Sequence, residues 1–164
     1  MDIFSTFASL RRAGWAAIPL RLIVGFGFMA HGVAKLQHGP DNFNALLAAM
    51  GTPAPQLLGW ATILIELVGG AAVLAGAFMP VVCLLMATVL LVAMFTVHLQ
   101  YGFSSVKLQA ITPSGAKFGP PGYEVDLTYL ASMVAILIGG PGPFALDTYL
   151  GSRRAEVRAG KAGK

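Results

Sequence analysis

The stretch RLIVGFGFMAHGVAK, residues 21–35, is apolar over most of its length, but it begins with Arg21 and ends with Lys35, one turn after His31. An apolar helix of about 20 residues is long enough to cross a bilayer. Ionisable side chains within such a helix are unfavourable in lipid, so they usually face the interior of a bundle and find a partner there. The stretch therefore predicts a membrane-spanning helix whose charged residues face neighbouring helices.

The composition of the whole chain agrees with this interpretation. Of the 164 residues, 56% are hydrophobic and only 11% are charged, whereas a soluble domain carries about 25% charged residues. Too few polar side chains remain to cover a surface that faces water. The composition therefore excludes a soluble protein and indicates an integral membrane protein.

Apolar runs and turn residues predict an all-α protein, a four-helix bundle embedded in the membrane. The predicted spans are residues 15–34, 56–78, 81–101 and 123–140. Pro80, in the short link GAFMP, cannot continue a helix and turns the chain between the second and third spans. The fourth run is weaker and must begin near Glu124 to cross fully. The link at residues 102–122 is rich in Gly, Pro and Ser and predicts an ordered loop without a helix.

The distribution of basic residues predicts the orientation of the chain. Seven of the eleven Lys and Arg residues lie near the two ends: Arg11, Arg12, Arg153, Arg154, Arg158, Lys161 and Lys164. Because positively charged flanks stay in the cytoplasm, both termini are expected there and both long loops outside. This predicts a multi-pass protein of the plasma (inner) membrane of a prokaryote, with the lipid bilayer and not nucleic acid as its surroundings.

The same pattern divides the chain into three parts. Residues 1–14 form a cytoplasmic N-terminal segment, which could lie along the inner membrane surface as a short amphipathic helix. Residues 15–150 form the membrane domain. Residues 151–164 form a basic tail without an apolar stripe, predicted to be disordered.

Arg21 and Glu66 are the first candidate pair of buried charges. Counted from the cytoplasmic ends of their spans, they differ in depth by roughly 9 Å at a rise of about 1.5 Å per residue. An arginine side chain covers much of that gap, and a carboxylate suits its planar fork. The prediction is a structural ion pair that locks two helices together; the alternative is a charged floor for a ligand cavity.

A second cluster is predicted at the outer face. The ends of the spans bring His31, Lys35, His98, Glu124 and Asp126 to one membrane depth. Such groups could shuttle protons, bind an anion or a quinone head group, or hold a metal. The structural alternative is that the lysine reaches the interface and that the acidic residues stabilise a helix N-terminus.

Several cofactor signals are absent from the sequence. The metal motifs HxxxH, HExxH and ExxH do not occur, so a metal site is disfavoured. A haem between His31 and His98 is geometrically conceivable in a four-helix bundle, but no other feature marks it. The chain has no phosphate-binding glycine loop, no nucleophile elbow and no CxxC pair. Its one cysteine, Cys83, is expected to be a buried apolar side chain. A redox role would therefore use a borrowed redox group and no covalent cofactor.

Five motifs resemble the DoxX family of small four-helix membrane proteins: HGVAKL after Arg21, ILIELVGG, VHLQYGF, GYEVDL and GGPGPFALD. The resemblance extends from about residue 21 to residue 150. It implies a four-helix bundle and a link to redox metabolism. Some relatives are the membrane subunit of a thiosulfate:quinone oxidoreductase, and others are said to assemble with superoxide dismutase and a sulfurtransferase in oxidative-stress defence. The family pattern points to these residues: Arg21, Lys35, Glu66, His98 and Glu124, with Asp147 at a helix end or in a loop.

Three functions remain open from the sequence. The first is a redox-linked subunit of a quinone-linked oxidoreductase, with redox partner proteins, that binds a quinone or a small sulfur compound between helices near the outer face. In it, His98 and Glu124 would handle protons, and His31, Lys35 and Asp126 would bind the ligand. The second is a scaffold without chemistry that binds a lipid or a partner protein. The third is a small transporter, which would require a homo-oligomer such as a dimer.

Overall fold

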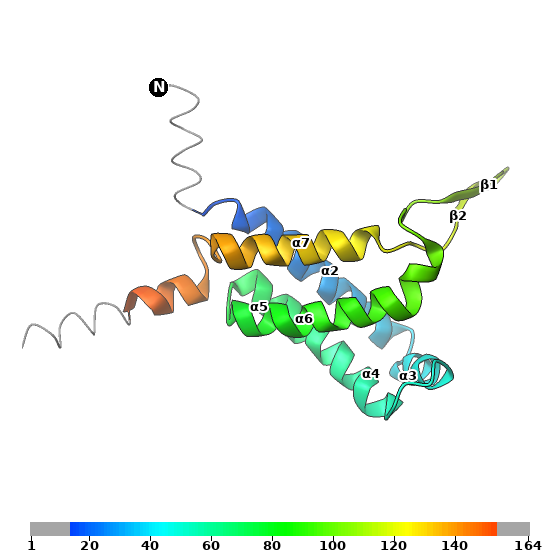
Figure 1. The fold of residues 1–164 in the computed structure, drawn as a ribbon, viewed down its shortest axis with the longest axis horizontal. Helices are drawn as coiled ribbons and strands as arrows, with labels where there is room; N and C mark the ends of the chain where they lie inside the picture. Colours follow the sequence, from blue (N-terminus) through cyan, green and yellow to red (C-terminus); the bar gives the residue numbers. More distant parts are fainter. Residues whose placement is uncertain (1–13, 154–164) are drawn as a thin grey trace, which may run out of the picture.

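The computed structural model describes residues 14–153, which form helices and one short hairpin of strands (Figure 1). The helices are α2 (Ala17–Gln37), α3 (Pro40–Ala49), α4 (Pro55–Leu64), α5 (Gly70–Ala75), α6 (Met79–Ala93) and α7 (Glu124–Gly139). A π-helical turn, η1 (Ile65–Gly69), joins α4 to α5 in one continuous helix. A second π-helical turn, η2 (Met94–His98), and a 3-10 turn, η3 (Leu99–Tyr101), extend α6.

Among residues 14–153, three continuous helices are long and apolar enough to cross a membrane: Ala17–Gln37, Pro55–Ala75 and Met79–Tyr101. The shortest of them have 21 residues, which reach about 31 Å and match a hydrocarbon core of about 30 Å. These helices confirm the first three predicted spans to within a few residues. The fourth predicted helix, α7, begins at Glu124 as expected and has 16 residues, which reach about 24 Å.

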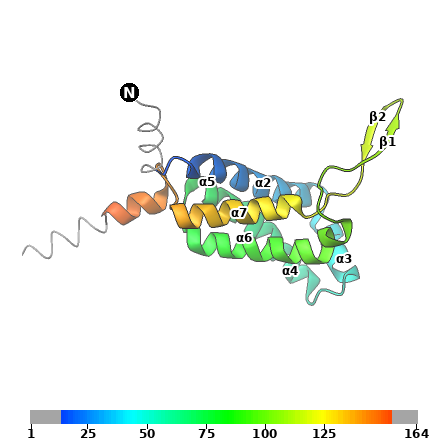
Figure 2. The ribbon, with the colours of Figure 1, turned by 45° about the horizontal axis from the view of Figure 1, so that its top comes forward.

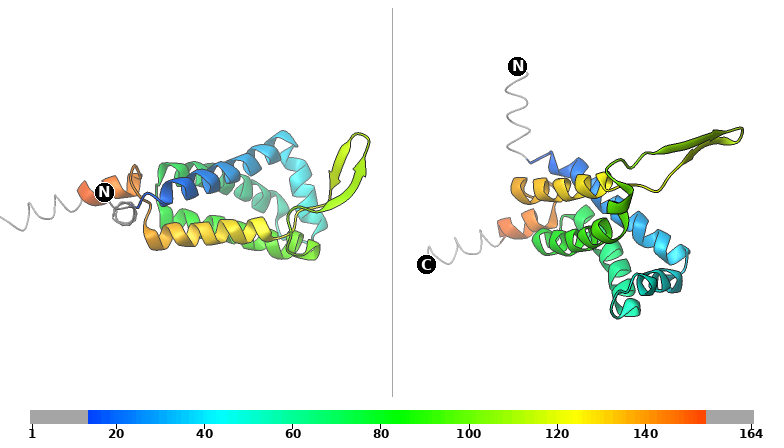
Figure 3. Two further views of the ribbon diagram at one scale, coloured as in Figure 1. Left: turned by 90° about the horizontal axis from the view of Figure 1, so that it is seen from above. Right: turned by 45° about the vertical axis from the view of Figure 1, so that its right-hand side comes forward.

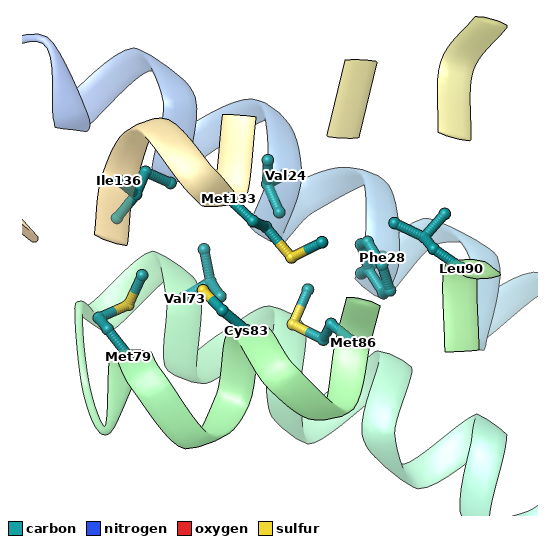
Figure 4. Close-up of a cluster of buried hydrophobic side chains, with 9 residues drawn as sticks. All are labelled: Val24, Phe28, Val73, Met79, Cys83, Met86, Leu90, Met133 and Ile136. Carbon is teal, nitrogen blue, oxygen red and sulfur yellow. The ribbon is translucent and has the colours of Figure 1, made fainter. Parts of the chain in front are cut away.

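The hydrophobic core lies between α2, α5, α6 and α7, which run side by side (Figures 2 and 3). Figure 4 shows its members: Val24, Phe28, Val73, Met79, Cys83, Met86, Leu90, Met133 and Ile136. Cys83 is 1% exposed, which confirms the expectation of a buried apolar side chain. The thioethers of the methionines are flexible and fill the irregular space between helices. Large apolar side chains on the outside of the helices, such as Phe26 and Leu84, are exposed and form a surface suited to lipid.

Glycines set the register between α2 and the continuous α4–η1–α5 helix. A Cβ atom on Gly25 would lie 2.7 Å from the carbonyl oxygen of Gly70, and one on Gly32 would lie 2.8 Å from the side chain of Leu67. Only glycine allows such close packing, as small residues do in membrane helix pairs generally. Gly25 is therefore level with Gly70, and Gly32 with η1.

The links between the spans contain structure that was not predicted. The link after α2 contains α3, whose start at Pro40 has a proline in the first turn, followed by Asp41; both residue types favour a helix N-terminus. The link after η3 contains two antiparallel strands, β1 (Leu108–Thr112) and β2 (Gly115–Phe118). The expectation of an all-α chain is corrected at this hairpin. The segment TPSG, residues 112–115, links the last residue of β1 to the first of β2 and has turn chemistry, which permits the reversal.

The molecule has two distinct ends along its helices. At the end called here the Arg21 end, α2 and α6 begin, and the turn after α7 contacts Arg21. At the opposite end, called the hairpin end, α7 begins and the β1–β2 hairpin projects away from the helices (Figures 1 and 2). Residues 146–153 are helical. Residues 1–13 of the predicted N-terminal segment 1–14, and residues 154–164 of the predicted tail 151–164, lie outside the described residues.

Candidate functional site

Arg21 is buried on α2 and hydrogen-bonds to backbone carbonyl groups. Its Nε donates to the carbonyl of Val73 at 3.0 Å, and Nη2 donates to that of Leu74. Nη1 donates to the carbonyls of Pro141 at 3.0 Å and Pro143 at 3.4 Å. The first two carbonyls belong to the last turn of α5, where the helix dipole is negative. The carbonyl of Val73 also accepts a hydrogen bond from the N–H of Gly76 at 3.0 Å. The guanidinium therefore joins α2, the end of α5 and the turn after α7.

The expected ion pair between Arg21 and Glu66 does not form. The Nζ of Lys35 lies 2.7 Å from both carboxylate oxygens of Glu66. Counting residues from the span ends failed because it ignored the stagger set by the glycines, which places Arg21 level with Val73 and Glu66 level with Gly32. The corrected pair is Lys35–Glu66, at the far end of the same helix face.

Lys35 and Glu66 are well placed for a strong interaction. The side chain of Glu66 is 7% exposed and that of Lys35 is 22% exposed. The ammonium group also lies 5.1 Å from the ring centroid of Phe43 on α3, within the range of a cation–π interaction. Lys35 thus connects the end of α2 with both η1 and α3.

A groove of about 360 Å³ lies beside this pair, between the end of α2 and α3. Its lining residues are His31, Ala34, Lys35, His38, Gly39, Asn42, Phe43 and Leu46. We call it the α2–α3 groove. The structure therefore brings together His31 and Lys35, two of the three residues predicted to bind a ligand. Phe43 was not predicted as part of the site, because α3 was not predicted; the Pro-Asp start of α3 was the available signal.

His98 and Asp126 form a second pair at the hairpin end. The Nδ1 of His98 lies 2.6 Å from Oδ2 of Asp126, whose side chain is 5% exposed, while the histidine side chain is 27% exposed. The pair joins the end of η2 to the first turn of α7. Asp126 was predicted to bind the ligand, but the structure engages it with His98.

Both ion pairs include a residue of a π-helical turn. Glu66 belongs to η1 and His98 to η2. Such turns are rare, interrupt the regular hydrogen-bond ladder of an α-helix, and occur frequently at functional sites. The π-helical turns therefore contain the same two residues, Glu66 and His98, that form the ion pairs.

The carboxylate of Glu124 bonds to the hairpin segment and to neither ion pair. Its Oε2 accepts a hydrogen bond from the backbone N–H of Ser105 at 2.9 Å. The hydroxyl of Ser105 donates to the carbonyl of Gly122 at 3.1 Å. These bonds attach the start of the hairpin segment to the start of α7. The observed contact of Glu124 is therefore with the base of the hairpin and not with His98.

Within residues 14–153, no three His, Cys, Asp or Glu side chains lie close enough together to suggest a metal site. The polar groups at this end of the helices are instead two separate ion pairs, Lys35–Glu66 and His98–Asp126. Two further histidines, His31 and His38, line the α2–α3 groove. Such groups can donate hydrogen bonds and exchange protons. The arrangement is therefore suited to holding a polar head group.

Asp147 caps the N-terminus of α6 at the Arg21 end. Its two carboxylate oxygens accept hydrogen bonds from the N–H groups of Phe78 at 2.8 Å and Met79 at 2.9 Å. These N–H groups have no partner within the helix, and a negative charge at this position also interacts favourably with the helix dipole. This position agrees with the helix-end or loop location implied by the family resemblance.

We expect Asp147→Ala to destabilise the protein by about 1 kcal/mol, the usual loss for a removed N-cap. The measurement is the thermal midpoint of the purified protein in detergent. Asp147→Asn is the matched control, because asparagine is also a good N-cap and retains an acceptor oxygen. Equal losses in both variants would show that the charge, and not the hydrogen bonding, stabilises the helix end.

The apolar helices and the buried charges define a helical, multi-pass membrane protein. Comparison with known proteins is more specific: residues 16–99 match the DoxX family, and the chain belongs to that family. The matched region contains Arg21, Lys35, Glu66 and His98. A Mycobacterium tuberculosis protein described as an uncharacterized membrane protein is 29% identical over 149 residues, which cover 84% of this chain and 83% of that protein. No solved structure matches the chain.

Proposed function

We propose that this protein is a quinone-binding membrane subunit of a redox system and that the quinone head group binds in the α2–α3 groove. The observation that carries the proposal is the position of Lys35. Its ammonium group is shared between the carboxylate of Glu66 and the face of Phe43, at the wall of the groove.

The size and chemistry of the groove support a quinone. Ligand sites are typically concave, about 300–1,000 Å³ in volume and lined mainly by apolar groups, with a few polar groups that orient the ligand. The α2–α3 groove, of about 360 Å³, is at the lower end of this range. A quinone ring can pack on Phe43, and its carbonyl oxygens can accept hydrogen bonds from Lys35 or His31.

The local charge favours a quinone over a small sulfur anion. The charge of Lys35 is balanced by that of Glu66 at 2.7 Å. Asp41, in the first turn of α3, adds a further negative charge near this region. An oxyanion of sulfur would need a net positive site, whereas a neutral quinone needs only hydrogen-bond donors.

In this proposal a redox partner protein supplies the electrons. Reduction of a quinone to a quinol takes two electrons and two protons. His98, held by Asp126 and partly exposed, is the group proposed to exchange protons with water at the hairpin end. Glu124, which accepts a hydrogen bond from the N–H of Ser105, is better explained by a role in holding the hairpin base. The redox part of the proposal is supported by the family resemblance.

We further propose that α7 is a fourth crossing. Its first turn contacts His98 through Asp126, and the turn after it contacts Arg21 through Pro141. The helix therefore covers nearly the same depth as its neighbours, and a bilayer can thin locally around a short span. Four crossings would place both basic ends of the chain on the cytoplasmic side of a prokaryotic plasma membrane.

Mass spectrometry of an organic extract from the purified protein tests the quinone proposal. We expect the wild type to retain a quinone in a fixed ratio to the chain, and His31→Ala and Phe43→Ala to lose it. His31 and Phe43 both line the groove, and replacing either one leaves the Lys35–Glu66 pair in place. Arg153→Ala, a change of an exposed side chain outside the groove, is the matched control and should retain the quinone.

The proposal fails if all four proteins carry only bulk phospholipid in equal amounts while their thermal midpoints agree. That result would favour a scaffold that binds a lipid or a partner protein. Uptake of a solute by vesicles that contain the wild type, without retained quinone, would instead favour the dimeric transporter.

A further inference from the structure

The β1–β2 hairpin is the part of the molecule that the proposed function does not use. It leaves the helices at the hairpin end and extends beyond them in every view (Figures 1, 2 and 3). A lone two-stranded hairpin is marginally stable in water unless one of its faces packs against something. Nearly all side chains of both strands are exposed, so this hairpin has a face that is available to pack against a further surface.

The strand register makes the hairpin amphipathic. Ile111 is opposite Ala116, and Leu108 is opposite Phe118. Ala116 and Phe118 are two residues apart on β2 and share a face. Their partners Ile111 and Leu108 lie on that same face, because a register shift between Leu108 and Ala110 offsets the alternation of β1 by one residue. Ile111 is 81% exposed, Phe118 is 59% exposed and Leu108 is 56% exposed. One face of the hairpin is therefore apolar and open.

The other face and the flanking residues are basic. Lys117, opposite Ala110, lies on the face away from Ile111. Residues 102–122 contain two lysines, Lys107 and Lys117, and no aspartate or glutamate. A segment with an apolar face and uncompensated lysines has the composition of elements that bind an anionic membrane surface.

The base of the hairpin lies at the level of the membrane interface. It follows the candidate span Met79–Tyr101 directly. The rings of Phe103 and Tyr123 contact edge to face at 5.6 Å, and Lys107 lies 5.8 Å from the ring of Tyr101. Aromatic residues concentrate at the head-group level of membrane proteins. The hairpin therefore begins where a candidate membrane-spanning helix ends.

We propose that the hairpin is a lipid-binding element that lies in the head-group region of the bilayer. Its apolar face, formed by Leu108, Ile111, Ala116 and Phe118, packs against the acyl chains. Lys107 and Lys117 contact the phosphates of anionic phospholipids. Among the surfaces that could cover the face, the bilayer fits best because it supplies both an apolar region and negative charge beside the end of the span Met79–Tyr101.

Spin labels on adjacent residues test this placement in the full-length protein. The label is attached at Ile111→Cys on the apolar face or at Ala110→Cys on the opposite face, with Cys83→Ala; a parallel set that keeps the buried Cys83 controls for folding. In vesicles of phosphatidylcholine and phosphatidylglycerol, the label at position 111 should collide several-fold more with oxygen than with a water-soluble nickel chelate. The label at position 110 should show the reverse preference.

Two results would overturn the proposal. Equal access of the nickel chelate to both labels would show that the hairpin stands in water. Spin–spin broadening at position 111 that disappears on dilution with unlabelled protein would show that a second copy covers the face. The charge contribution has its own test: Lys107→Gln with Lys117→Gln should increase nickel access at position 111 several-fold, and an unchanged value would exclude phosphate contact.

Discussion

Arg21→Ala is expected to remove most of the folded protein from a detergent extract. Arg21 is 5% exposed, and its guanidinium donates to four carbonyl groups, on α5 and in the turn after α7. Hydrogen bonds from a charged donor contribute about 1.5–3 kcal/mol each, so their combined loss should exceed about 3 kcal/mol. That is a large part of the roughly 5–15 kcal/mol that stabilises a typical domain. The measurement is the thermal midpoint from size-exclusion chromatography of heated samples.

Two further variants separate the contributions of this arginine. Arg21→Lys keeps the charge but replaces the fork by one ammonium group, so an intermediate midpoint is expected. Arg153→Ala removes an exposed arginine that stacks on Tyr149, and it should leave the midpoint almost unchanged. A wild-type midpoint for Arg21→Ala would contradict the role assigned to the carbonyl contacts.

Lys35→Met is expected to destabilise the protein by about 3 kcal/mol, because it leaves the carboxylate of Glu66 buried without its partner. Breaking a buried pair costs about 3–5 kcal/mol in soluble proteins, and the lysine here is partly exposed, which places the estimate at the lower end. The double variant Lys35→Met/Glu66→Leu should recover most of the loss, since replacing both charges by apolar groups is often neutral. The measurement is the thermal midpoint of the wild type, Lys35→Met, Glu66→Leu and the double variant, which together form a double-mutant cycle.

The cycle also separates stability from ligand binding. The double variant should fold but retain no quinone, because the ammonium group at the groove wall is gone. Losses that simply add in the double variant would show that Lys35 and Glu66 do not interact. A double variant that folds and still retains quinone would move the ligand away from the α2–α3 groove.

The sequence was sufficient to predict the long helices because their signals are local. Apolar runs of the right length and Pro80, which lies in the first turn of α6 just after the chain reverses, predicted where the candidate spans begin and end. Helix periodicity also placed Arg21 and Lys35 on one face of α2, and both do face the second helix. The hairpin was not predicted, because its strands are short and the turn residues alone did not indicate whether they pair.

The partners of the buried charges were harder to predict because they depend on how two helices are staggered. That stagger follows from the contact of Gly25 with Gly70, which no residue count contains. The same limit applies to the α2–α3 groove. His31 and Lys35 were found from their positions at the end of a span, but Phe43 came into contact only through α3, a short helix inside a link.

The carbonyl contacts of Arg21 have a consequence for how the chain is made. Val73 follows Arg21 by 52 residues, and Pro141 follows it by 120 residues. The chain is synthesised from its N-terminus. Arg21 can therefore form its hydrogen bonds only after the end of α5, and then the turn after α7, have been synthesised. During insertion, α2 therefore holds an incompletely satisfied charge until the last part of the domain leaves the ribosome. That turn is the closing step of assembly, and a nascent chain that stalls before it would expose Arg21 to membrane quality control.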